Sequence, residues 1–269
     1  MQTGLKNKHV IITGANGGIG QATAELFNKE GANLSLHYHK NTKTVQELKS
    51  KLKGKFSFFQ ADLSSEQSVL DFFQGAIENY GRIDILIVNH GIWPEENVPA
   101  HKMKVNRWRR TIEINLNAAF FCSKHFLKNL EQYPGENASI TYVGSTAGIF
   151  GEAGHVDYSV SKFGLQGLLY SLKNEIVHLA YRGRVNLVAP GWTVTPMTDK
   201  FMGDKQLIKS VLQTMPLRKI ARAVDIANTI VFLSSDNLAG HISGQIVTVA
   251  GGMEGRILHE PEGININKI

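Results

Sequence analysis

Tyr158 and Lys162 are the residues of this sequence whose types and spacing point most directly to chemistry. They lie four positions apart, so on a helix both side chains share one face. A free phenol has a pKa of about 10, and a neighbouring ammonium group lowers that pKa by favouring the phenolate. Such a pair predicts proton transfer at a bound oxygen atom, although a Tyr-x-x-x-Lys pattern also arises by chance on amphipathic helices.

Two further polar residues could join this pair. Ser145 stands thirteen positions before Tyr158, at the end of an expected strand. Asn115 lies among apolar residues in an expected helix, where a polar amide destabilises the fold unless it is hydrogen-bonded. Asn117 is the competing candidate in the same stretch. We therefore predict a catalytic group of Asn115, Ser145, Tyr158 and Lys162.

A glycine-rich segment near the N-terminus, residues 13–20, follows an apolar run and begins an expected helix. Glycines there permit a tight turn and let the backbone approach a pyrophosphate, and the free N–H groups of a helix N-terminus favour negative charge. This context predicts a nucleotide site, with a plain structural turn as the alternative. The predicted residues of the site are Gly14, Asn16, Gly18, Ile19 and Gly20.

These motifs together resemble the short-chain dehydrogenase/reductase family. The glycine-rich segment follows that family's T-G-x-x-x-G-x-G pattern, and the matches run in the family's order over residues 9–252. The resemblance implies hydride transfer between a nicotinamide dinucleotide and a carbonyl/alcohol pair. It implies that Ser145 polarises the carbonyl oxygen, that Tyr158 exchanges the proton, and that Lys162 lowers the phenol pKa and holds the nicotinamide ribose. Asn115 would kink its helix and hold a water linked to Lys162.

Three more segments resemble cofactor-binding parts of that family. Asp62 resembles the aspartate that contacts the adenine amino group, and as an alternative it could cap the following helix. Residues 89–91 resemble the N-N-A-G segment beneath the adenosine, with His90 as a departure from it. Residues 190–195 resemble P-G-x-x-x-T, in which Thr195 would bond the nicotinamide carboxamide. The cofactor residues so implied are Asp62, Leu63, Asn89, Gly91, Pro190, Gly191, Thr193 and Thr195, together with Tyr158 and Lys162.

The end of the second expected strand bears on the choice between NAD(H) and NADP(H). NAD-dependent enzymes of this fold place an acid there, about 20 residues past the glycines, for the ribose 2′-hydroxyl group. This chain has Tyr38, His39 and Lys40 there and no nearby acid. Positive charge favours a 2′-phosphate, so NADP(H) is the expected cofactor. An NAD(H)-dependent alcohol, sugar or steroid dehydrogenase of the same family stays open, because Gly17 stands where the family often has an arginine.

Large side chains just beyond the catalytic segments predict the walls of a substrate pocket, although each could equally be a core or subunit contact. Apolar walls favour an alkyl or alicyclic ketone over a free sugar. Within the family, the 3-oxoacyl-carrier-protein reductases give the closest general resemblance, and Arg107, Arg109 and Lys128 near the mouth would suit an acidic carrier protein. The predicted substrate residues are Trp93, Ser145, Phe150, His155, Trp192, Met197 and Phe201.

These residues need a scaffold that places strand ends side by side. Short runs of Val, Ile and Leu alternate with amphipathic stretches, including a long one over about 105–130, and this predicts an α/β fold. We expect a Rossmann-type, doubly wound parallel sheet in a single domain over 1–269. Segment 191–217 is expected to be a substrate-binding loop or lid, and 253–269 a C-terminal tail. The expected strands are His9–Thr13, Asn33–Tyr38, Lys55–Gln60, Ile83–Asn89, Ser139–Gly144, Arg184–Ala189 and Gln245–Ala250.

Composition and charge narrow the function classes. The formal net charge of +6 is spread along the chain, and the basic run 101–110 lacks the interleaved aromatic residues that stack bases, so no nucleic-acid partner is expected. The ten histidines show no metal-ligand spacing, and no apolar run is long enough to span a membrane. The single cysteine, Cys122, is expected to be a buried thiol in a reducing compartment, so we expect a cytoplasmic protein.

A dehydrogenase-like fold can also serve as a nucleotide-binding sensor or scaffold without catalysis. Such proteins usually lose the catalytic Tyr or Lys, whereas this sequence keeps all four catalytic positions, so an enzyme is expected. The helices that carry Asn115 and Tyr158 bear apolar residues on more than one face. The resemblance implies that these helices pair across a two-fold axis in a homotetramer.

Overall fold

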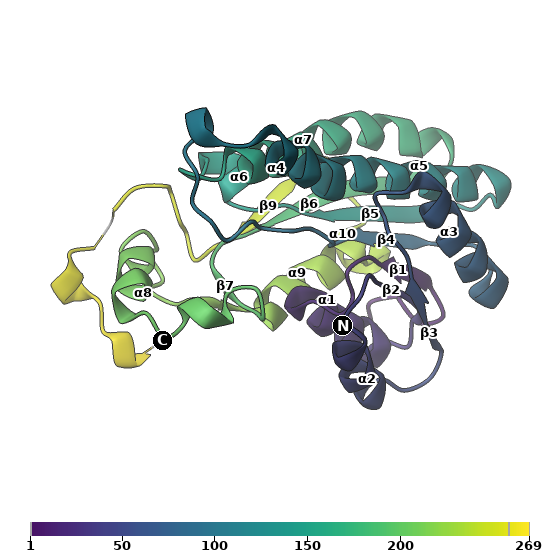
Figure 1. Ribbon diagram of the computed structural model, residues 1–269. Coiled ribbons are helices and arrows are strands. Elements are labelled where there is room, and N and C mark those ends of the chain that lie inside the picture. The colour runs from purple at the N-terminus through teal and green to yellow at the C-terminus, as the bar shows by residue number, and fades with distance from the viewer. Residues whose placement is uncertain (1, 258, 269) are drawn as a thin grey trace.

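The computed structural model describes residues 2–257 and 259–268 and has a parallel sheet between two layers of helices (Figure 1). The sheet has the strand order β3-β2-β1-β4-β5-β6-β9, and every pair is parallel. The chain builds outward from β1 to β3, then returns to the other side of β1 with β4, so the sheet is doubly wound. The strands are β1 (His9–Ile12), β2 (Asn33–Tyr38), β3 (Phe56–Gln60), β4 (Ile85–Val88), β5 (Asn137–Val143), β6 (Arg182–Pro190) and β9 (Ile246–Val249).

The expected fold class is confirmed, because each expected apolar run forms one of these strands. Every residue of β1 and β4 is buried. Helices cover both faces of a parallel sheet, so its central strands need apolar side chains on both sides. This requirement explains why these runs are nearly continuous in Val, Ile and Leu rather than alternating with polar residues.

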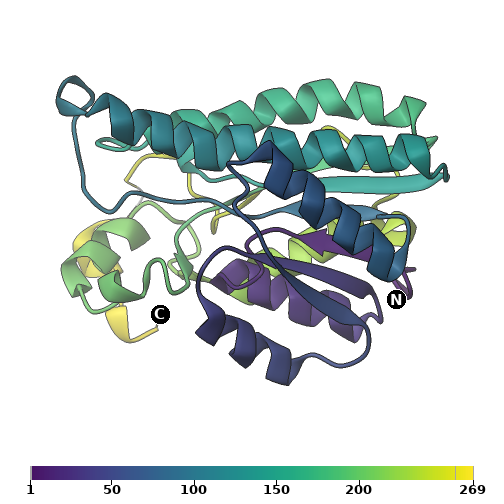
Figure 2. The ribbon, with the colours of Figure 1, turned by 45° about the vertical axis from the view of Figure 1, so that its right-hand side comes forward.

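Two hydrophobic cores lie on opposite faces of the sheet. One is formed by the sheet with α3, α5 and α7, and the other by the sheet with α1, α2 and α9. Figure 2 shows α5 and α7 side by side above the sheet, with α1 and α2 below it. The helices are α1 (Gly18–Lys29), α2 (Thr42–Lys51), α3 (Glu66–Tyr80), α4 (Val105–Ile112), α5 (Ala118–Gln132), α6 (Ala147–Phe150), α7 (Val156–Glu175), α8 (Lys205–Leu212), α9 (Ala223–Ser234) and α10 (Asp236–Ala239).

The long helix expected over 105–130 is interrupted. Between α4 and α5 the backbone forms a π-helical segment, Glu113–Asn117, with Asn115 buried at its centre. A π segment inserts an extra residue into the helical ladder, which redirects the side chains and changes the backbone pairing locally, and such segments are frequent at functional sites. The interruption therefore falls on the one polar residue of this helix that was predicted to be catalytic.

The segment 191–217 differs from the expected loop. It contains a short strand, β7 (Thr193–Val194), which pairs with β8 (Ala221–Arg222), and it contains α8. The C-terminal segment packs against this unit: Ile264 joins a small core with Ile208, Leu212 and Ile220. Both ribbon views show the C-terminal segment beside α8 (Figures 1 and 2). Residues 258 and 269 of the expected tail lie outside the described residues.

Within residues 2–257 and 259–268, the structure contains no helix that is both long enough and apolar enough to cross a membrane.

Candidate active site

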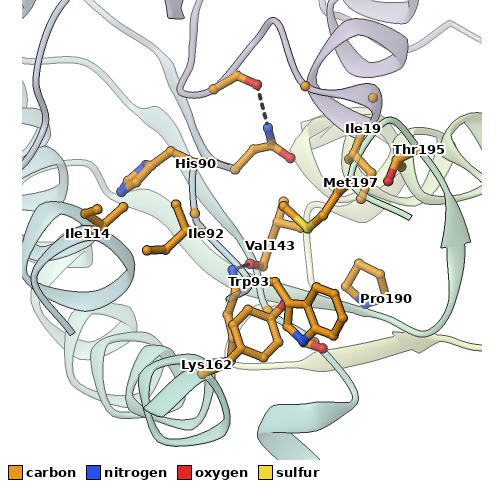
Figure 3. A pocket seen from close by; sticks show the side chains of 18 of the residues that line it. Ile19, His90, Ile92, Trp93, Ile114, Val143, Lys162, Pro190, Thr195 and Met197 are labelled. Atoms are coloured by element: carbon orange, nitrogen blue, oxygen red, sulfur yellow. Dashed lines mark hydrogen bonds between the residues drawn. The ribbon is translucent and has the colours of Figure 1, made fainter. Parts of the chain in front are cut away.

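A cavity of about 750 Å³ lies at the carboxyl ends of β1, β4, β5 and β6 (Figure 3). Open parallel sheets bind ligands at this edge, where the winding direction reverses. In Figure 3, Ile19 and Thr195 lie at one end of the cavity and Lys162 and Trp93 at the other. The cavity therefore joins the glycine-rich turn to the predicted catalytic residues.

The glycine-rich turn is shaped to meet a phosphate group. Gly14 has a φ of +61°, and a Cβ added to Gly20 would lie 2.3 Å from the Gly14 carbonyl oxygen, so neither position accepts a side chain without strain. Asn89 holds the turn by donating from Nδ2 to the carbonyl oxygens of Thr13, at 3.1 Å, and Gly14, at 3.0 Å. The N-terminus of α1 follows directly, and its N–H groups fit the pyrophosphate of a dinucleotide.

Replacing Gly20 with alanine tests this close approach. We expect Gly20→Ala to lower the free energy of unfolding by about 1–3 kcal/mol, because the new methyl group overlaps the backbone at Gly14 and Ala15. It should also weaken dinucleotide binding by moving the turn. The matched control is Gly167→Ala in α7, where an added Cβ meets nothing within 4 Å. Thermal unfolding and dinucleotide titration of both variants measure the effects, and equal behaviour of the two would contradict the close packing.

The end of the cavity that is expected to hold the adenosine contains predicted and unpredicted residues. Asp62 lines it and accepts hydrogen bonds from Ser64 N, at 3.0 Å, and Ser64 Oγ, at 2.6 Å, so it also holds the turn before α3. The hydrogen bond from the Ser64 hydroxyl is the main reason that the pKa of Asp62 is lowered. An ionised carboxylate at this position can accept a hydrogen bond from an amino group. Other predicted residues that line the cavity here are Gly14, Asn16, Gly18, Ile19, Leu63, Asn89 and Gly91.

At the end of β2 the structure separates the predicted cofactor residues. His39 lines the cavity, whereas Tyr38 and Lys40 do not. Tyr38 is the last residue of β2, in which successive side chains point to opposite faces, so it faces away from its neighbour His37, which lines the cavity. Sequence reasoning missed three residues here that line the cavity, namely His37, Asn41 and Thr44.

His37 is a buried histidine that supports the glycine-rich turn. Its Nδ1 accepts a hydrogen bond from Gly14 N at 3.0 Å, and its Nε2 donates to the Ala61 carbonyl oxygen at 3.1 Å. These partners require the neutral ring, and burial lowers the pKa of His37 to about 4. The sequence does contain a signal for His37, namely a histidine within an apolar run that is expected to form a strand.

The predicted catalytic side chains meet beside α7. Ser145, Tyr158 and Lys162 all line the cavity. Lys162 Nζ donates to the Val143 carbonyl oxygen at 2.9 Å and lies 5.8 Å from the centroid of the Tyr158 ring. A Cβ added to Gly91 would lie 3.2 Å from Asn115 Oδ1 and 3.3 Å from Lys162 Nζ, so these two polar groups face the same glycine.

Asn115 is near this group but does not line the cavity. Its Nδ2 donates to the Ile92 carbonyl oxygen, at 2.9 Å, and to Ser161 Oγ, at 3.0 Å, while its Oδ1 accepts from Ile92 N at 2.8 Å. Both N–H groups of the amide are thus used within the protein. The competing Asn117 donates instead to Glu113 at 2.7 Å. The side chain of Asn115 therefore ties the segment after β4 to α7.

The protonation of Tyr158 and Lys162 differs from the expectation. Burial raises the pKa of Tyr158 to about 12, with the negative charge of Glu152 adding to the rise and a hydrogen bond with Ser145 opposing it. Burial lowers the pKa of Lys162 to about 8. In the protein itself, desolvation therefore outweighs the attraction between ammonium and phenolate. The phenol keeps its proton near neutral pH, which suits a proton donor in the reduction of a carbonyl group.

The segment after β6 lies over the glycine-rich turn. Pro190, Gly191, Thr193 and Thr195 all line the cavity, as predicted. Thr193 Oγ1 donates to the Gly191 carbonyl oxygen at 2.9 Å. A Cβ added to Gly18 would lie 2.9 Å from Thr195 Cβ, so this threonine packs directly on the first residue of α1. The packing places Thr195 at the end of the cavity formed by the glycine-rich turn (Figure 3).

The predicted substrate walls are only partly in the cavity. Trp93, Trp192 and Met197 line it, together with Ser145. Phe150, His155 and Phe201 do not line the cavity. His155 and Phe201 pack against Trp93 from behind, and Phe150 lies outside the cavity. The His155 ring stacks on Trp93 with centroids 4.8 Å apart, and the Phe201 ring meets Trp93 edge-on at 5.7 Å. Phe150 is 44% exposed.

The expected basic rim needs a correction at Arg107. Its guanidinium pairs with the buried Asp157 at 3.1 Å and donates to the carbonyl oxygens of Glu96 and Gly154. Arg107 is therefore an internal brace beside Tyr158 and not a free surface charge. Arg109 and Lys128 are exposed, but Lys128 lies ten residues along α5 from Ala118, which lines the cavity, and is therefore about 15 Å away from the mouth. No cluster of three or more metal-ligating side chains occurs in the described part of the chain.

Comparisons with known proteins give the same assignment from a different direction. The family model "Enoyl-(Acyl carrier protein) reductase" matches residues 14–254. A crystal structure of a short-chain dehydrogenase/reductase (glucose/ribitol dehydrogenase) from Brucella melitensis superposes with a TM-score of 0.84 at 31% identity, covering 93% of this chain and 97% of that one. The chain belongs to the short-chain dehydrogenase/reductase family. The predicted family is thus confirmed.

Relatives within the short-chain dehydrogenase/reductase family have a specific name. The 3-oxoacyl-[acyl-carrier-protein] reductase FabG of Staphylococcus epidermidis is 34% identical over 253 residues, which cover 92% of this chain and 99% of that protein. The protein of that name from Thermotoga maritima is 32% identical over 253 residues, covering 93% and 98%. Levodione reductase has a TM-score of 0.85 at 27% identity, covering 91% of this chain and 97% of that one. This short-chain dehydrogenase/reductase is an oxidoreductase of a carbonyl/alcohol pair that uses a nicotinamide nucleotide.

Proposed function

We propose that this enzyme is an NADP(H)-dependent reductase that converts a ketone to a secondary alcohol, and reverses the reaction when the alcohol is in excess. The observation that carries the proposal is that Ser145, Tyr158 and Lys162 line the same cavity as the glycine-rich turn. The bound dinucleotide supplies the hydride. The Ser145 hydroxyl polarises the carbonyl oxygen, and the Tyr158 phenol gives that oxygen its proton.

The other residues of the site orient the cofactor and resupply the proton that Tyr158 gives up. Lys162 holds the nicotinamide ribose and favours the phenolate that forms when Tyr158 loses its proton. Asn115 fixes the segment of Ile92 against α7 through its hydrogen bonds to Ile92 and Ser161. In this proposal a water beside Asn115 would return a proton from solvent to Lys162. Thr195 bonds the nicotinamide carboxamide, and Asp62 accepts from the adenine amino group.

The choice of NADP(H) rests on the charge around the adenosine ribose. His39 lines the cavity after β2, and both His39 and Lys40 are close enough to Asp62 to help lower its pKa. No carboxylate stands at the end of β2 to accept from a ribose 2′-hydroxyl group. A 2′-phosphate would meet positive charge there, together with the polar side chains of Asn41 and Thr44.

The preference can be measured and reversed. The wild-type enzyme should have a higher kcat/KM for NADPH than for NADH. His39→Asp should lower the NADPH preference about tenfold or more, equivalent to about 1.4 kcal/mol, because the new carboxylate repels a 2′-phosphate and accepts from a 2′-hydroxyl group. Lys49→Glu makes a larger change in charge in the last turn of α2, outside the cavity, and should have the smaller effect. A wild-type enzyme that uses NADH equally well or better would contradict the proposal.

The proposed substrate comes from the name of the relatives, and the proposed assembly comes from exposed apolar side chains. The name of the relatives makes a 3-oxoacyl thioester of a carrier protein a substrate to test, and the exposed Arg109 suits an acidic carrier. The helices α5 and α7 expose Phe120 (47%) and Phe163 (62%), so we propose that they form the contacts of a homotetramer. We also propose that segment 191–217 with α8 acts as the lid of the cavity, and that the enzyme works in the cytoplasm.

A further inference from the structure

Glu152 is a carboxylate on the substrate side of the cavity to which neither the motifs nor the proposed reaction gives a role. It follows α6 and lines the cavity, with a side chain that is 33% exposed. Trp93 Nε1 donates to its two oxygens at 3.1 and 3.3 Å. His155 Nδ1 lies 3.3 Å from Oε1. The wall residue Trp93 therefore holds this carboxylate in place, and the His155 ring lies beside it.

His155 lies behind Glu152 and does not saturate its carboxylate. His155 Nε2 lies 2.8 Å from the Pro94 carbonyl oxygen, which can only accept, so Nε2 donates there. The buried Nδ1 makes no hydrogen bond, although it lies 3.3 Å from Glu152 Oε1. Burial raises the pKa of Glu152.

The Glu152 carboxylate offers accepting positions to the cavity. A carboxylate has about four lone-pair directions, and the N–H group of Trp93 does not use them all. The surrounding wall is mostly apolar, with Trp192, Met197 and Met253. Glu152 and the reacting Tyr158 line the same cavity, and the charge of Glu152 contributes to the raised pKa of Tyr158.

We propose that Glu152 is a specificity-determining residue that accepts a hydrogen bond from a hydroxyl group of the substrate, so that the preferred ketone carries a hydroxyl group on a mainly apolar skeleton. The inference rests on the proposed reductase function. A hydroxyl group fits better than an ammonium group, because Lys162 and Arg110 on the same cavity repel cations. A 3-oxoacyl thioester cannot make this contact, since its second carbonyl group has no proton to donate.

The test compares matched ketones. Alkyl and alicyclic ketones with a hydroxyl group at increasing distance from the carbonyl are each paired with the analogue that lacks it, and kcat/KM is measured with saturating NADPH. The wild-type enzyme should prefer at least one hydroxyketone about tenfold or more over its analogue. Glu152→Met should abolish that preference, mainly by raising KM, because the hydroxyl contact is the same before and during hydride transfer. Glu95→Met removes an exposed carboxylate outside the cavity and should keep it.

The outcomes separate the two proposals. Glu152→Gln keeps the shape of the side chain and should lose part of the preference, so it replaces Glu152→Met if that variant does not fold. Turnover by the wild type without any preference for a hydroxyketone would overturn the inference alone, as would a preference that survives both Glu152 variants. Faster turnover of an aminoketone or a 3-oxoacyl thioester than of every hydroxyketone would also overturn it. Absence of turnover with every ketone would overturn the reductase proposal, and the inference with it.

Discussion

Tyr158→Phe is expected to lower kcat by at least about three decades while leaving dinucleotide binding intact. General acid catalysis by a positioned group contributes about 10²–10⁴-fold, and the phenol is the group placed to act as the acid here. Its pKa of about 12 keeps the proton available, and the neighbouring Ser145 hydroxyl is a far weaker acid. Lys162 Nζ is turned toward the Val143 carbonyl oxygen. Single-turnover reduction of a ketone with NADPH measures the chemical step directly.

A second buried tyrosine provides the control for this experiment. Tyr142 on β5 bonds to Ser123 at 2.6 Å within the core, away from the cavity lining. Tyr142→Phe should lower the free energy of unfolding by roughly 1–3 kcal/mol by leaving the Ser123 hydroxyl with one partner fewer, with little change in kcat. Titration with NADPH should give similar dissociation constants for both variants and the wild type. A loss of less than tenfold in Tyr158→Phe would show that another group delivers the proton.

The fold could be predicted because its signals are local. The strands are continuous apolar runs in the sequence. Tyr158 and Lys162 are four residues apart, a spacing that places both side chains on the same face of a helix. The π-helical segment at Asn115 could not be read in the same way. Its amide is satisfied by Ile92 and Ser161, which lie 23 and 46 positions away in the chain. Contacts of that range have no periodicity, so the apolar pattern alone predicted one continuous helix over about 105–130, and only the family resemblance implied a kink at Asn115.

The substrate-binding wall of the cavity was even harder to predict from the sequence. Phe150 and His155 were predicted as wall residues from their closeness to Tyr158 in sequence, but closeness in sequence does not decide which way a side chain points. His155 turns away to contact Pro94 and support Trp93, while Glu152 takes the place on the wall. Arg107 was counted as a surface charge because its partner Asp157 lies 50 positions away. Long-range polar pairs decide these positions, and the sequence of one chain does not reveal them.

The second large effect is expected at Lys162, through the pH dependence of alcohol oxidation. Oxidation needs the Tyr158 phenolate, so its rate should rise with pH as the phenol loses its proton. The ammonium group of Lys162 favours the phenolate, and removing it leaves burial and the charge of Glu152 to raise the pKa of Tyr158 further. Lys162→Ala should therefore move the rising limb to higher pH. Each pKa unit of that movement corresponds to about 1.4 kcal/mol.

Three variants distinguish this role from that of a helix lysine in general. Lys162→Ala should also weaken NADPH binding, because the same side chain is proposed to hold the ribose. Lys162→Arg keeps a positive charge but cannot reproduce the position of Nζ, so its pH limb and its NADPH affinity should lie between those of the wild type and the alanine variant. Lys173→Ala removes a lysine from the exposed part of the same helix and should change neither. If Lys162→Ala keeps the wild-type pH profile and activity, the buried lysine only supports the helix through Val143, and the proton transfer does not depend on its charge.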